Sequence, residues 1–158
     1  MGVEIERKFL VCGAGWEVAE PKAYCQGYLS RTAERTVRVR IGGDSAYITV
    51  KGKSQGATRL EFEYPIPVED ARQMLELCEQ PLIEKTRRVI PIGGHHWEVD
   101  EFEGANAGLV IAEIELSSED EVFEKPAWVG QEVTSERRYF NSQLSLHPWP
   151  EWPENRQS

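Results

Sequence analysis

Eight short segments of the chain alternate apolar with polar residues, and most of the polar members are charged. Successive side chains of a β-strand point to opposite faces, so this alternation predicts strands. The predicted strands are residues 3–11, 23–30, 35–42, 45–52, 58–66, 83–91, 96–102 and 109–116. Two glycine pairs, in Gly42-Gly43-Asp44 and Gly93-Gly94, separate neighbouring segments and predict tight hairpin turns.

Helical spacing of apolar residues is limited to short stretches. Residues 68–79 place four apolar side chains at positions i, i+3, i+4 and i+7, which predicts an amphipathic helix. These four are Ala71, Met74, Leu75 and Cys78. Ser118 and Glu121 predict a capping box for a second helix that ends near residue 125. Thr134 or Ser135 is expected to begin a third helix that ends near residue 145.

The chain ends in a segment rich in proline and tryptophan. Three prolines between residues 147 and 154 exclude a regular helix or a central strand. We expect a loosely docked end, with the alternative that Trp149 and Trp152 pack on the body of the protein or on a second subunit. The sequence therefore divides into one folded domain, residues 1–146, and a tail, residues 147–158.

Sorting the strand residues by parity separates two faces of different chemistry. One face collects apolar residues such as Val39, Phe62 and Trp97. The other collects polar and charged residues of both signs: Glu4, Glu6, Lys8, Gln26, Tyr28, Ser30, Arg38, Arg40, Lys51, Lys53, Arg59, Glu61, Glu63, Lys85, Arg87, Glu98, Asp100, Glu113 and Glu115. A half-buried sheet with one solvated face would explain any single strand. The whole set favours an enclosed functional face, because like charges two residues apart repel unless an opposite charge lies between them.

Eight strands can close into a barrel of modest bore, and closure would place one face inside, which we take to be the charged face. The apolar face would then lie outside, where helices and a partner subunit must cover it. We therefore expect an α+β fold dominated by β-structure. It is an eight-stranded antiparallel closed barrel, or tunnel, with a charged lumen and about three helices outside. Three helices are too few to cover the whole outer face, which favours a homodimer.

The acidic pairs of the charged face suit a divalent cation. Glu4 and Glu6 would have Cα atoms about 6.6 Å apart, so their carboxylates can converge on one ion. The same spacing recurs in Glu61-Phe62-Glu63 and in Glu113-Ile114-Glu115. Carboxylate oxygens without His or Cys ligands select Mg²⁺ or Mn²⁺ rather than zinc.

The basic residues of the same face suit a chain of linked phosphates. Arginine offers forked donors to phosphate oxygens, and lysine acts as a point charge. Phosphoryl transfer needs mainly positioning and charge neutralisation, and a bound metal lowers the pKa of its water. The sequence holds no Walker A motif and no G-x-S-x-G elbow. Tyr28 shares the parity of Lys8 and can orient it, with a purely structural hydroxyl as the alternative.

The net charge and the cysteine content of the chain limit its possible binding partners and its cellular environment. The net charge of −9 argues against general nucleic-acid binding, which relies on a cationic surface. Three cysteines without C-x-x-C spacing favour a reducing cytoplasm over a disulfide framework or a zinc site. We expect no signal peptide, because the first residues enter a charged strand at once, and no membrane span, because no apolar stretch approaches 18 residues.

The segment Glu4-Ile5-Glu6-Arg7-Lys8 matches the E-x-E-x-K signature, and the chain resembles the CYTH superfamily, the triphosphate tunnel metalloenzymes. The resemblance covers the chain from Val3 to about Leu144. Further motifs carry it in the expected order: Arg38-Val39-Arg40, Thr49-Val50-Lys51, Glu61-Phe62-Glu63, Glu84-Lys85-Thr86-Arg87, Glu98-Val99-Asp100 and Glu113-Ile114-Glu115.

The resemblance implies an eight-stranded tunnel whose lumen binds a triphosphate with a divalent metal, Mg²⁺ or Mn²⁺. The implied metal ligands are Glu4, Glu6, Glu61, Glu63, Asp100, Glu113 and Glu115. The implied triphosphate contacts are Lys8, Arg38, Arg40, Lys51, Lys85 and Arg87, with Lys53 and Arg59 added because they share the parity. The residues expected to take part in catalysis are Glu4, Glu6, Lys8 and Lys85 from these two sets, together with Tyr28.

The chain is similar in length and layout to the compact bacterial tripolyphosphatases. The expected activity is therefore hydrolysis of inorganic tripolyphosphate to pyrophosphate and phosphate in the cytoplasm. Water would be activated by a second metal held partly by Glu113 and Glu115, or alternatively by a Lys8–Tyr28 base. Hydrolysis of thiamine triphosphate or nucleoside triphosphates is the alternative activity. Class IV adenylate cyclase activity and a non-catalytic module that binds polyphosphate or nucleotide rank below it.

Overall fold

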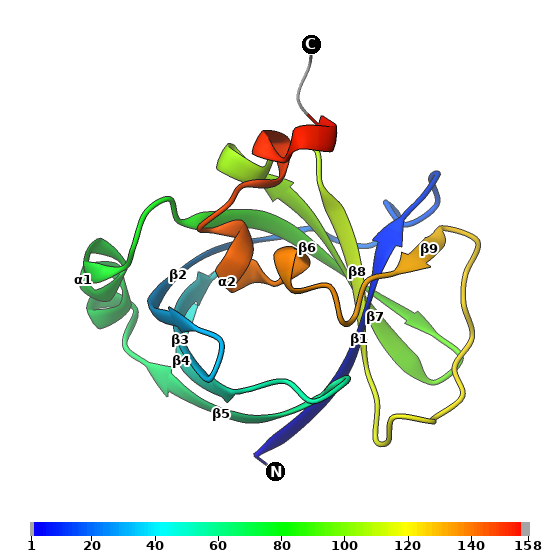
Figure 1. Cartoon of the computed structure of the whole chain (residues 1–158), viewed down its shortest axis with the longest axis horizontal. Coiled ribbons are helices and arrows are strands. Elements are labelled where there is room, and N and C mark those ends of the chain that lie inside the picture. The colour runs from blue at the N-terminus through cyan, green and yellow to red at the C-terminus, as the bar shows by residue number, and fades with distance from the viewer. Residues whose placement is uncertain (1, 156–158) are drawn as a thin grey trace.

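A closed ring of antiparallel strands forms the body of the protein in the computed structural model, which describes residues 2–155 (Figure 1). Nine strands are present among these residues: β1 (Val3–Val11), β2 (Lys22–Thr32), β3 (Arg35–Gly42), β4 (Ser45–Gly52), β5 (Thr58–Ile66), β6 (Ile83–Ile92), β7 (His95–Glu103), β8 (Val110–Glu115) and β9 (Val129–Glu132). Two α-helices and four 3₁₀ turns join them: α1 (Val68–Leu77), η1 (Gly104–Asn106), η2 (Arg137–Tyr139), α2 (Asn141–Leu144), η3 (Trp149–Glu151) and η4 (Pro153–Asn155).

Strand β1 closes the ring. The sheet order is β5-β4-β3-β2-β6-β7-β8-β1, and an additional pairing of β5 with β1 joins the two ends. One edge of β1 pairs with β8 over residues 6–10. The other edge is shared, because residues 3–5 pair with β5 and the end of β1 pairs with β9. The predicted closed barrel of eight antiparallel strands is therefore confirmed, and Figure 1 looks through its opening.

The hairpin turns follow the glycine pairs. Gly43 between β3 and β4, and Gly93 and Gly94 between β6 and β7, all have positive φ angles of +58° to +85°. This is the left-handed region that two-residue hairpin turns require and that glycine enters without steric cost. The predicted hairpins therefore form where the sequence indicates.

Two helix predictions need correction. The helix expected from Ser118 to about residue 125 is absent, and the segment forms a turn followed by irregular chain. The Glu121 carboxylate accepts a hydrogen bond from the Ser117 N–H and contacts the His95 ring instead of capping a helix. The third predicted helix is broken into η2 and α2, because Phe140 has an extended backbone between them. Helix α1 forms as predicted.

The apolar outer face of the ring is covered in three places. Helix α1 packs on β2, β3 and β4, and the loop that contains Phe123 and Trp128 covers part of β1, β7 and β8. The third cover is the C-terminal segment, whose Trp152 is only 7% exposed and stacks edge-on against Tyr139 at 5.0 Å. The tail thus packs on the body, as the alternative interpretation held, and residues 156–158 lie outside the described part of the chain.

The outer face of β5 and of the start of β1 keeps large apolar side chains in contact with solvent. Val3, Leu60, Phe62 and Tyr64 are 43–58% exposed. Val3 is the register partner of Leu60, so the patch is continuous across the strand pair that closes the ring. No helix among residues 2–155 is long and apolar enough to cross a membrane.

Candidate functional site in the tunnel

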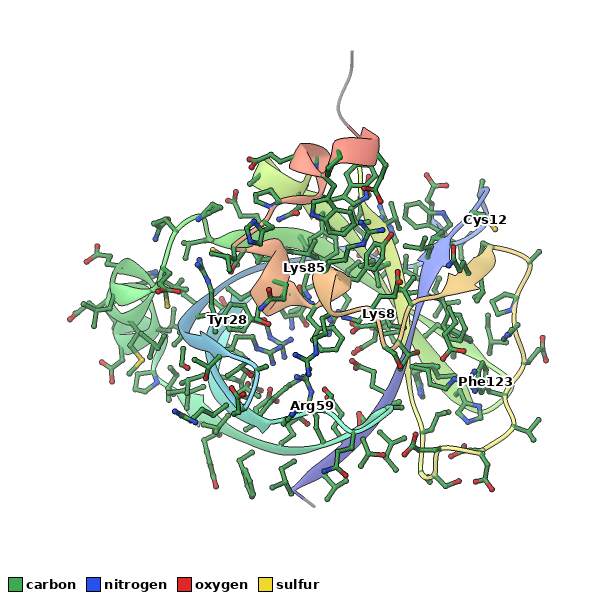
Figure 2. All side chains as sticks on the ribbon, viewed as in Figure 1. Lys8, Cys12, Tyr28, Arg59, Lys85 and Phe123 are labelled. Carbon is green, nitrogen blue, oxygen red and sulfur yellow. The ribbon has the colours of Figure 1, made fainter. Side chains whose placement is uncertain are left out.

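The lumen of the ring contains a cavity of about 180 Å³, which we call the tunnel cavity. All eight strands of the ring, β1 to β8, contribute lining residues, and so does the segment Phe140-Asn141-Ser142. Its lining residues are Glu4, Glu6, Lys8, Tyr28, Thr36, Arg38, Arg40, Lys51, Arg59, Glu61, Glu63, Lys85, Arg87, Glu98, Glu113, Glu115, Phe140, Asn141 and Ser142. Figure 2 shows four of them, Lys8, Tyr28, Arg59 and Lys85, around the opening.

The structure brings together nearly all the residues that the sequence pattern assigned to the site. Two of the expected residues do not line the tunnel cavity. Asp100 is buried behind its wall at 1% exposure. Lys53 is exposed and lines a second, smaller cavity, which shares Thr36, Arg59, Phe140 and Ser142 with the tunnel cavity.

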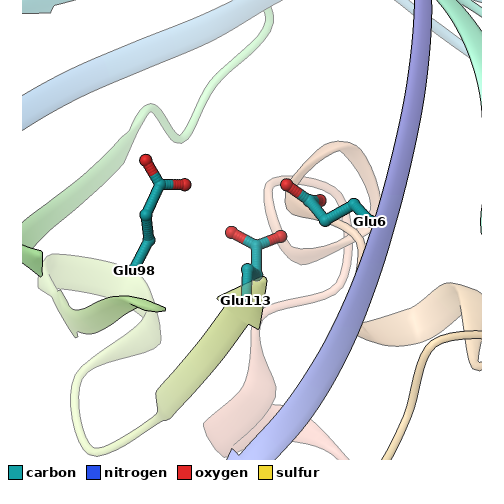
Figure 3. A group of neighbouring side chains, drawn as sticks. All are labelled: Glu6, Glu98 and Glu113. Carbon is teal, nitrogen blue, oxygen red and sulfur yellow. The ribbon is translucent and has the colours of Figure 1, made fainter. Parts of the chain in front are cut away.

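Three carboxylates converge inside the tunnel. Glu6 on β1, Glu98 on β7 and Glu113 on β8 place one oxygen each within 4.8 Å of one another (Figure 3). Burial raises the pKa of Glu6 well above its ordinary value, and the charge of Glu113 adds to that rise. Burial acts on Glu113 in the same direction, but Lys8 and a hydrogen bond from Glu6 hold its pKa well below the ordinary value. Three acids this close need a proton or a cation between them.

Cations and carboxylates alternate along the β4–β5 wall. Lys51 Nζ lies 3.1 Å from a Glu4 oxygen and 3.4 Å from a Glu61 oxygen, and Arg59 Nε lies 3.3 Å from the same Glu4 oxygen. Burial works to raise the pKa of Glu4, but Lys51 and Arg59 outweigh it and lower that pKa. Glu4 is therefore held as an anion between two cations.

A second group of cations is crowded without full compensation. Arg38 and Arg40 share the single carboxylate of Glu63, at 3.3 and 3.7 Å. Burial lowers the pKa of Arg40, and repulsion from Arg38 and Arg87 lowers it further. Arg38 and Arg40 have one carboxylate between them, and Arg87 adds to the positive charge around Arg40, so this wall offers donors to an anion with several oxygens.

Asp100 holds two cations at the tunnel wall. Arg87 donates from Nε and from its terminal nitrogen to the two Asp100 oxygens at 2.7 and 2.9 Å, and Lys85 Nζ lies 2.8 Å from one of them. Burial lowers the pKa of Lys85 to about 8, although Asp100 opposes this shift. Lys85 also donates to the Asn141 side chain at 3.3 Å. Since its oxygens are taken up by Arg87 and Lys85, Asp100 positions these cations.

Lys8 and Tyr28 face the same cavity but have different partners. Lys8 Nζ donates to the Tyr139 carbonyl oxygen at 3.3 Å and lies 3.4 Å from a Glu113 oxygen. The Tyr28 hydroxyl accepts a long hydrogen bond, 3.5 Å, from the Gln26 amide. No contact joins Lys8 to Tyr28 within residues 2–155 of this structure.

The structure adds lining residues that the motif series did not select. Thr36 precedes Arg38 and Arg40 at the same parity, so the strand alternation contained its signal. Phe140, Asn141 and Ser142 come from the short helical segment, for which strand periodicity gives no information. Phe140 packs under two cations of the lumen, with Lys8 Nζ 5.3 Å and the Arg59 guanidinium carbon 5.6 Å from its ring centre.

Comparison with known families and proteins agrees with this geometry. The CYTH domain model matches residues 2–146, and the chain belongs to this family. A protein of Acetivibrio thermocellus named inorganic triphosphatase is 51% identical over 156 residues, covering 98% of this chain and 100% of that relative. A protein of the same name from Nitrosomonas europaea is 35% identical over 147 residues, covering 90% of this chain and 97% of the relative.

Solved structures show the same fold. A crystal structure described as an inorganic triphosphatase has a TM-score of 0.66 at 34% identity, with 90% of this chain and 94% of the other covered. A putative adenylate cyclase from Bacillus halodurans has a TM-score of 0.57 at 18% identity, with 76% and 84% covered. The second likeness concerns the fold alone.

Proposed function

We propose that this CYTH domain protein hydrolyses inorganic tripolyphosphate to pyrophosphate and phosphate in its tunnel, with Mg²⁺ or Mn²⁺ as the metal. The observation that carries the proposal is the tunnel cavity itself, where cations for a phosphate chain and carboxylates for a metal line one enclosed space. Two relatives named inorganic triphosphatase, at 51% and 35% identity, support the choice of substrate.

The cations of the lumen would bind the triphosphate. Arg38, Arg40 and Arg87 present guanidinium groups that suit bridging and terminal phosphate oxygens, and their mutual repulsion would be relieved by a polyanion. Lys8, Lys51, Arg59 and Lys85 complete the proposed set. Because phosphoryl transfer depends mainly on position and charge neutralisation, these residues would supply much of the catalysis.

The three converging carboxylates fit a hard divalent cation. Glu6, Glu98 and Glu113 offer only oxygen donors, and their mutual repulsion is what a cation would remove. We propose them as the main metal ligands, with Glu98 in the place that the sequence pattern gave to Asp100. When bound, such a metal neutralises phosphate charge and lowers the pKa of a coordinated water.

The reaction adds one water across one P–O–P linkage. The water oxygen forms a bond to a terminal phosphorus, the bond from that phosphorus to the pyrophosphate oxygen breaks, and a proton must leave the water. Glu115 lines the tunnel cavity, and burial and the charges of Glu4 and Glu61 raise its pKa, so we propose it as the group that accepts that proton. A Lys8–Tyr28 base fits less well, because the Lys8 ammonium group is anchored by Tyr139 and Glu113.

Hydrolysis of thiamine triphosphate or nucleoside triphosphates is the second candidate, because the same lumen contacts would hold their triphosphate groups. The decisive assay measures phosphate release from tripolyphosphate, thiamine triphosphate and ATP, each with Mg²⁺, Mn²⁺ or a chelator. We expect metal-dependent release, fastest from tripolyphosphate. Absence of metal-dependent release from all three would disprove the enzyme proposal.

Removing one charge from the lumen should abolish turnover without unfolding the protein. Glu6→Gln removes a proposed metal ligand, and Arg40→Gln removes a proposed phosphate contact. We expect kcat/KM for tripolyphosphate to fall about 100-fold or more in each variant. Glu76→Gln, on the exposed side of α1, is the matched control and should retain full activity. Equal activity in all three variants would show that the charged inner face of the ring is not the active site.

Three expectations about the environment stay predictions. The protein is expected in the cytoplasm, without nucleic-acid partners, and as a homodimer. The exposed patch of Val3, Leu60, Phe62 and Tyr64 is a surface on which a second copy would bury apolar side chains. Light scattering on the purified chain, alone and with Phe62→Glu, measures the oligomeric state directly.

A further inference from the structure

Tyr24 is an aromatic residue on the inner face of β2 that the proposed mechanism does not use. Its register partners are Gly42 on β3 and Lys85 on β6. Residues that lie diagonally across neighbouring strands on one face are within reach of long side chains. Arg40 on β3 and Arg87 on β6 occupy these diagonal positions, so the sheet places Tyr24 between two arginines of the tunnel cavity.

The Tyr24 ring has three cations around it. The guanidinium carbon of Arg40 lies 5.0 Å from the ring centre, and that of Arg87 lies 5.3 Å from it. Lys22 Nζ is also 5.3 Å from the ring centre. A cation within about 6 Å of an aromatic ring centre is attracted by the electron-rich face of the ring. The ring therefore offsets part of the repulsion that Arg87 exerts on Arg40.

A glycine on the neighbouring strand fixes the position of the ring. A Cβ atom on Gly42 would come within 2.2 Å of Tyr24 Cε1 and within 2.5 Å of Tyr24 Cδ1, so only glycine leaves room for the ring here. An aromatic side chain opposite a glycine restores the packing that the strand pair loses at that point. Tyr24 is thus a fixed support for the cations beside it.

Arg40 has few other partners. In the described part of the chain its ion-pair partner is Glu63, at 3.7 Å, and Arg38 shares that carboxylate at 3.3 Å. The Arg40 Nε atom is buried and has no hydrogen-bond partner among the described residues. Arg87 differs, because its Nε and one terminal nitrogen donate to Asp100. Arg40 therefore keeps donors that a ligand can use.

A ring and a carboxylate support an arginine in different ways. A carboxylate holds the guanidinium group by accepting its N–H donors, so those donors are no longer available to a ligand. An aromatic ring attracts the cation as a whole and takes up none of its donors in N–H···O bonds. Support by a ring therefore suits an arginine whose donors are needed by a bound anion.

We propose that Tyr24 is a positioning residue of the triphosphate site, whose ring holds Arg40 at the tunnel cavity with its N–H donors left for phosphate oxygens. This inference rests on the proposed triphosphatase function. Tyr24 does not line the tunnel cavity, so it acts through Arg40 and not by touching the substrate. Without the ring, Arg40 would be supported mainly by the carboxylate that it shares, and tripolyphosphate would have to order it on binding.

The test measures hydrolysis of tripolyphosphate by the whole chain with metal. Tyr24→Leu should lower kcat/KM about 3- to 30-fold, because it removes the cation–π attraction on Arg40. Tyr24→Phe, which keeps the ring, should stay close to the wild-type value. Tyr64→Leu, at an exposed tyrosine on the outer face of β5, is the matched control and should leave kcat/KM unchanged.

Two further measurements distinguish positioning from simple packing. Phenylalanine with one or three ring fluorines at position 24 weakens the electron-rich face of the ring with little change of shape. The value of kcat/KM should therefore fall stepwise as fluorines are added. In an Arg40→Gln background, Tyr24→Leu should have little further effect, because both substitutions remove the same contact with phosphate.

The outcomes separate this inference from the proposed function. No hydrolysis of tripolyphosphate by the wild type would disprove the proposed function, and this inference with it. Hydrolysis that does not change along the fluorine series would show that Tyr24 only fills space, and would overturn this inference alone. A full effect of Tyr24→Leu in the Arg40→Gln background would overturn it as well. The fluorine series decides the matter even if Tyr24→Leu does not fold, because each of its members keeps the ring.

Discussion

Asp100 is the residue on which two buried cations of the tunnel wall depend. It accepts from Arg87 at 2.7 and 2.9 Å and from Lys85 at 2.8 Å, and all three side chains are at most 9% exposed. Arg87 and Lys85 lower the pKa of Asp100 against the opposing effect of burial. A depressed folded-state pKa means that this acid stabilises the fold above its unfolded-state pKa and loses that contribution as the pH falls through the folded-state value.

Replacing Asp100 should therefore be costly. Asp100→Asn removes the nearest counter-charge of both cations and leaves Arg87 only the Glu98 and Glu113 carboxylates, at 3.2 and 3.7 Å. We expect a loss of about 3 kcal/mol in unfolding free energy at pH 7. Glu101→Gln is the matched control on the same strand, since its partner Arg88 lies 3.3 Å away at a more exposed position. It should cost about 1 kcal/mol or less. Urea unfolding measures both, and equal losses would contradict this account of Asp100.

Single residues also mark where sequence reasoning reaches its limit. Strand parity placed Glu98 and Asp100 on one face of β7, and both do point inward from the ring. Parity does not show that Glu98 reaches the tunnel cavity while Asp100 lies behind the cavity wall, enclosed by cations. That choice depends on Arg87 and Lys85 of the neighbouring strand, which is a tertiary contact with no local signal.

At the scale of elements, β9 is attached to β1 by one well-formed ion pair. Arg7 donates to both oxygens of Glu132 at 2.8 and 2.6 Å, and Thr134 donates to one of them at 2.6 Å. The hydrogen bond from Arg7 is the main cause that lowers the pKa of Glu132. The pair is partly exposed, so its contribution is modest.

The pH dependence of stability should report this pair. Because the folded-state pKa of Glu132 is lowered, its contribution is complete above the ordinary glutamate pKa and is lost as the pH falls through the folded-state value. Glu132→Gln should cost about 0.5 kcal/mol at pH 7 and progressively less as the pH falls below the ordinary glutamate pKa. Unfolding in urea at pH 7 and pH 3, with Glu17→Gln on an exposed turn as control, measures the difference. A cost that is undiminished at pH 3 would point to another role for Glu132.

Helix α1 lies so close to β2 that the strand needs a glycine. A Cβ atom on Gly27 would come within 2.7 Å of Cys78 Cβ and of a Leu82 methyl carbon. Cys78 follows the last residue of α1, and its Cβ atom is bonded directly to the backbone. The end of the helix must therefore move to make room for a methyl group on residue 27.

Gly27→Ala should therefore destabilise the fold by about 1–3 kcal/mol, because it overpacks this junction. Gly52→Ala is the matched control at the end of β4, where the nearest atom to the new Cβ is 3.5 Å away. It should be neutral or stabilising by about 0.5 kcal/mol. Thermal unfolding of both variants checks the expectation, which a stable Gly27→Ala protein would refute.

The elements that the sequence predicted are those with a strong local pattern. The eight ring strands alternate over several residues, and α1 has an apolar stripe. Strand β9 is only four residues long, Val129–Glu132, and forms because β1 offers it a free edge. The helix predicted after Ser118 fails because Glu121 bonds to Ser117 and His95 instead. Short elements and caps depend on partners that local patterns do not reveal.

At the scale of the whole molecule, the tail supports the wall of the tunnel. Trp152 stacks on Tyr139 at 5.0 Å, Arg138 lies 4.3 Å from the Trp152 ring centre, and Arg138 pairs with Glu154 at 2.7 Å. The supported segment carries the Tyr139 carbonyl that holds Lys8 and the Asn141 side chain that holds Lys85.

Loosening the tail should therefore impair the site. We expect Trp152→Ala to lower kcat/KM for tripolyphosphate about 10- to 100-fold, at a temperature where the protein is folded. Trp16→Ala is the matched control, because Trp16 is also 7% exposed but packs in a different apolar cluster, with Phe9 and Trp97. Both variants should lose about 3 kcal/mol of stability, and only Trp152→Ala should lose activity. Trp152→Phe should keep most of the activity that Trp152→Ala loses. A similar loss of activity in Trp16→Ala would contradict the proposal that the tail supports the tunnel wall.

The three partners of β1 also set the order in which the protein can be made. A ribosome releases β1 before β5, β8 and β9, and the last of these pairings waits for Val129. Until β8 has been made, the edge of β1 that pairs with it must be hydrogen-bonded to water, and Glu6 has no Glu113 near it. Ring closure over such separations in sequence is slow compared with local folding. The nascent chain is therefore expected to stay open, and inactive, until β8 and β9 have been synthesised.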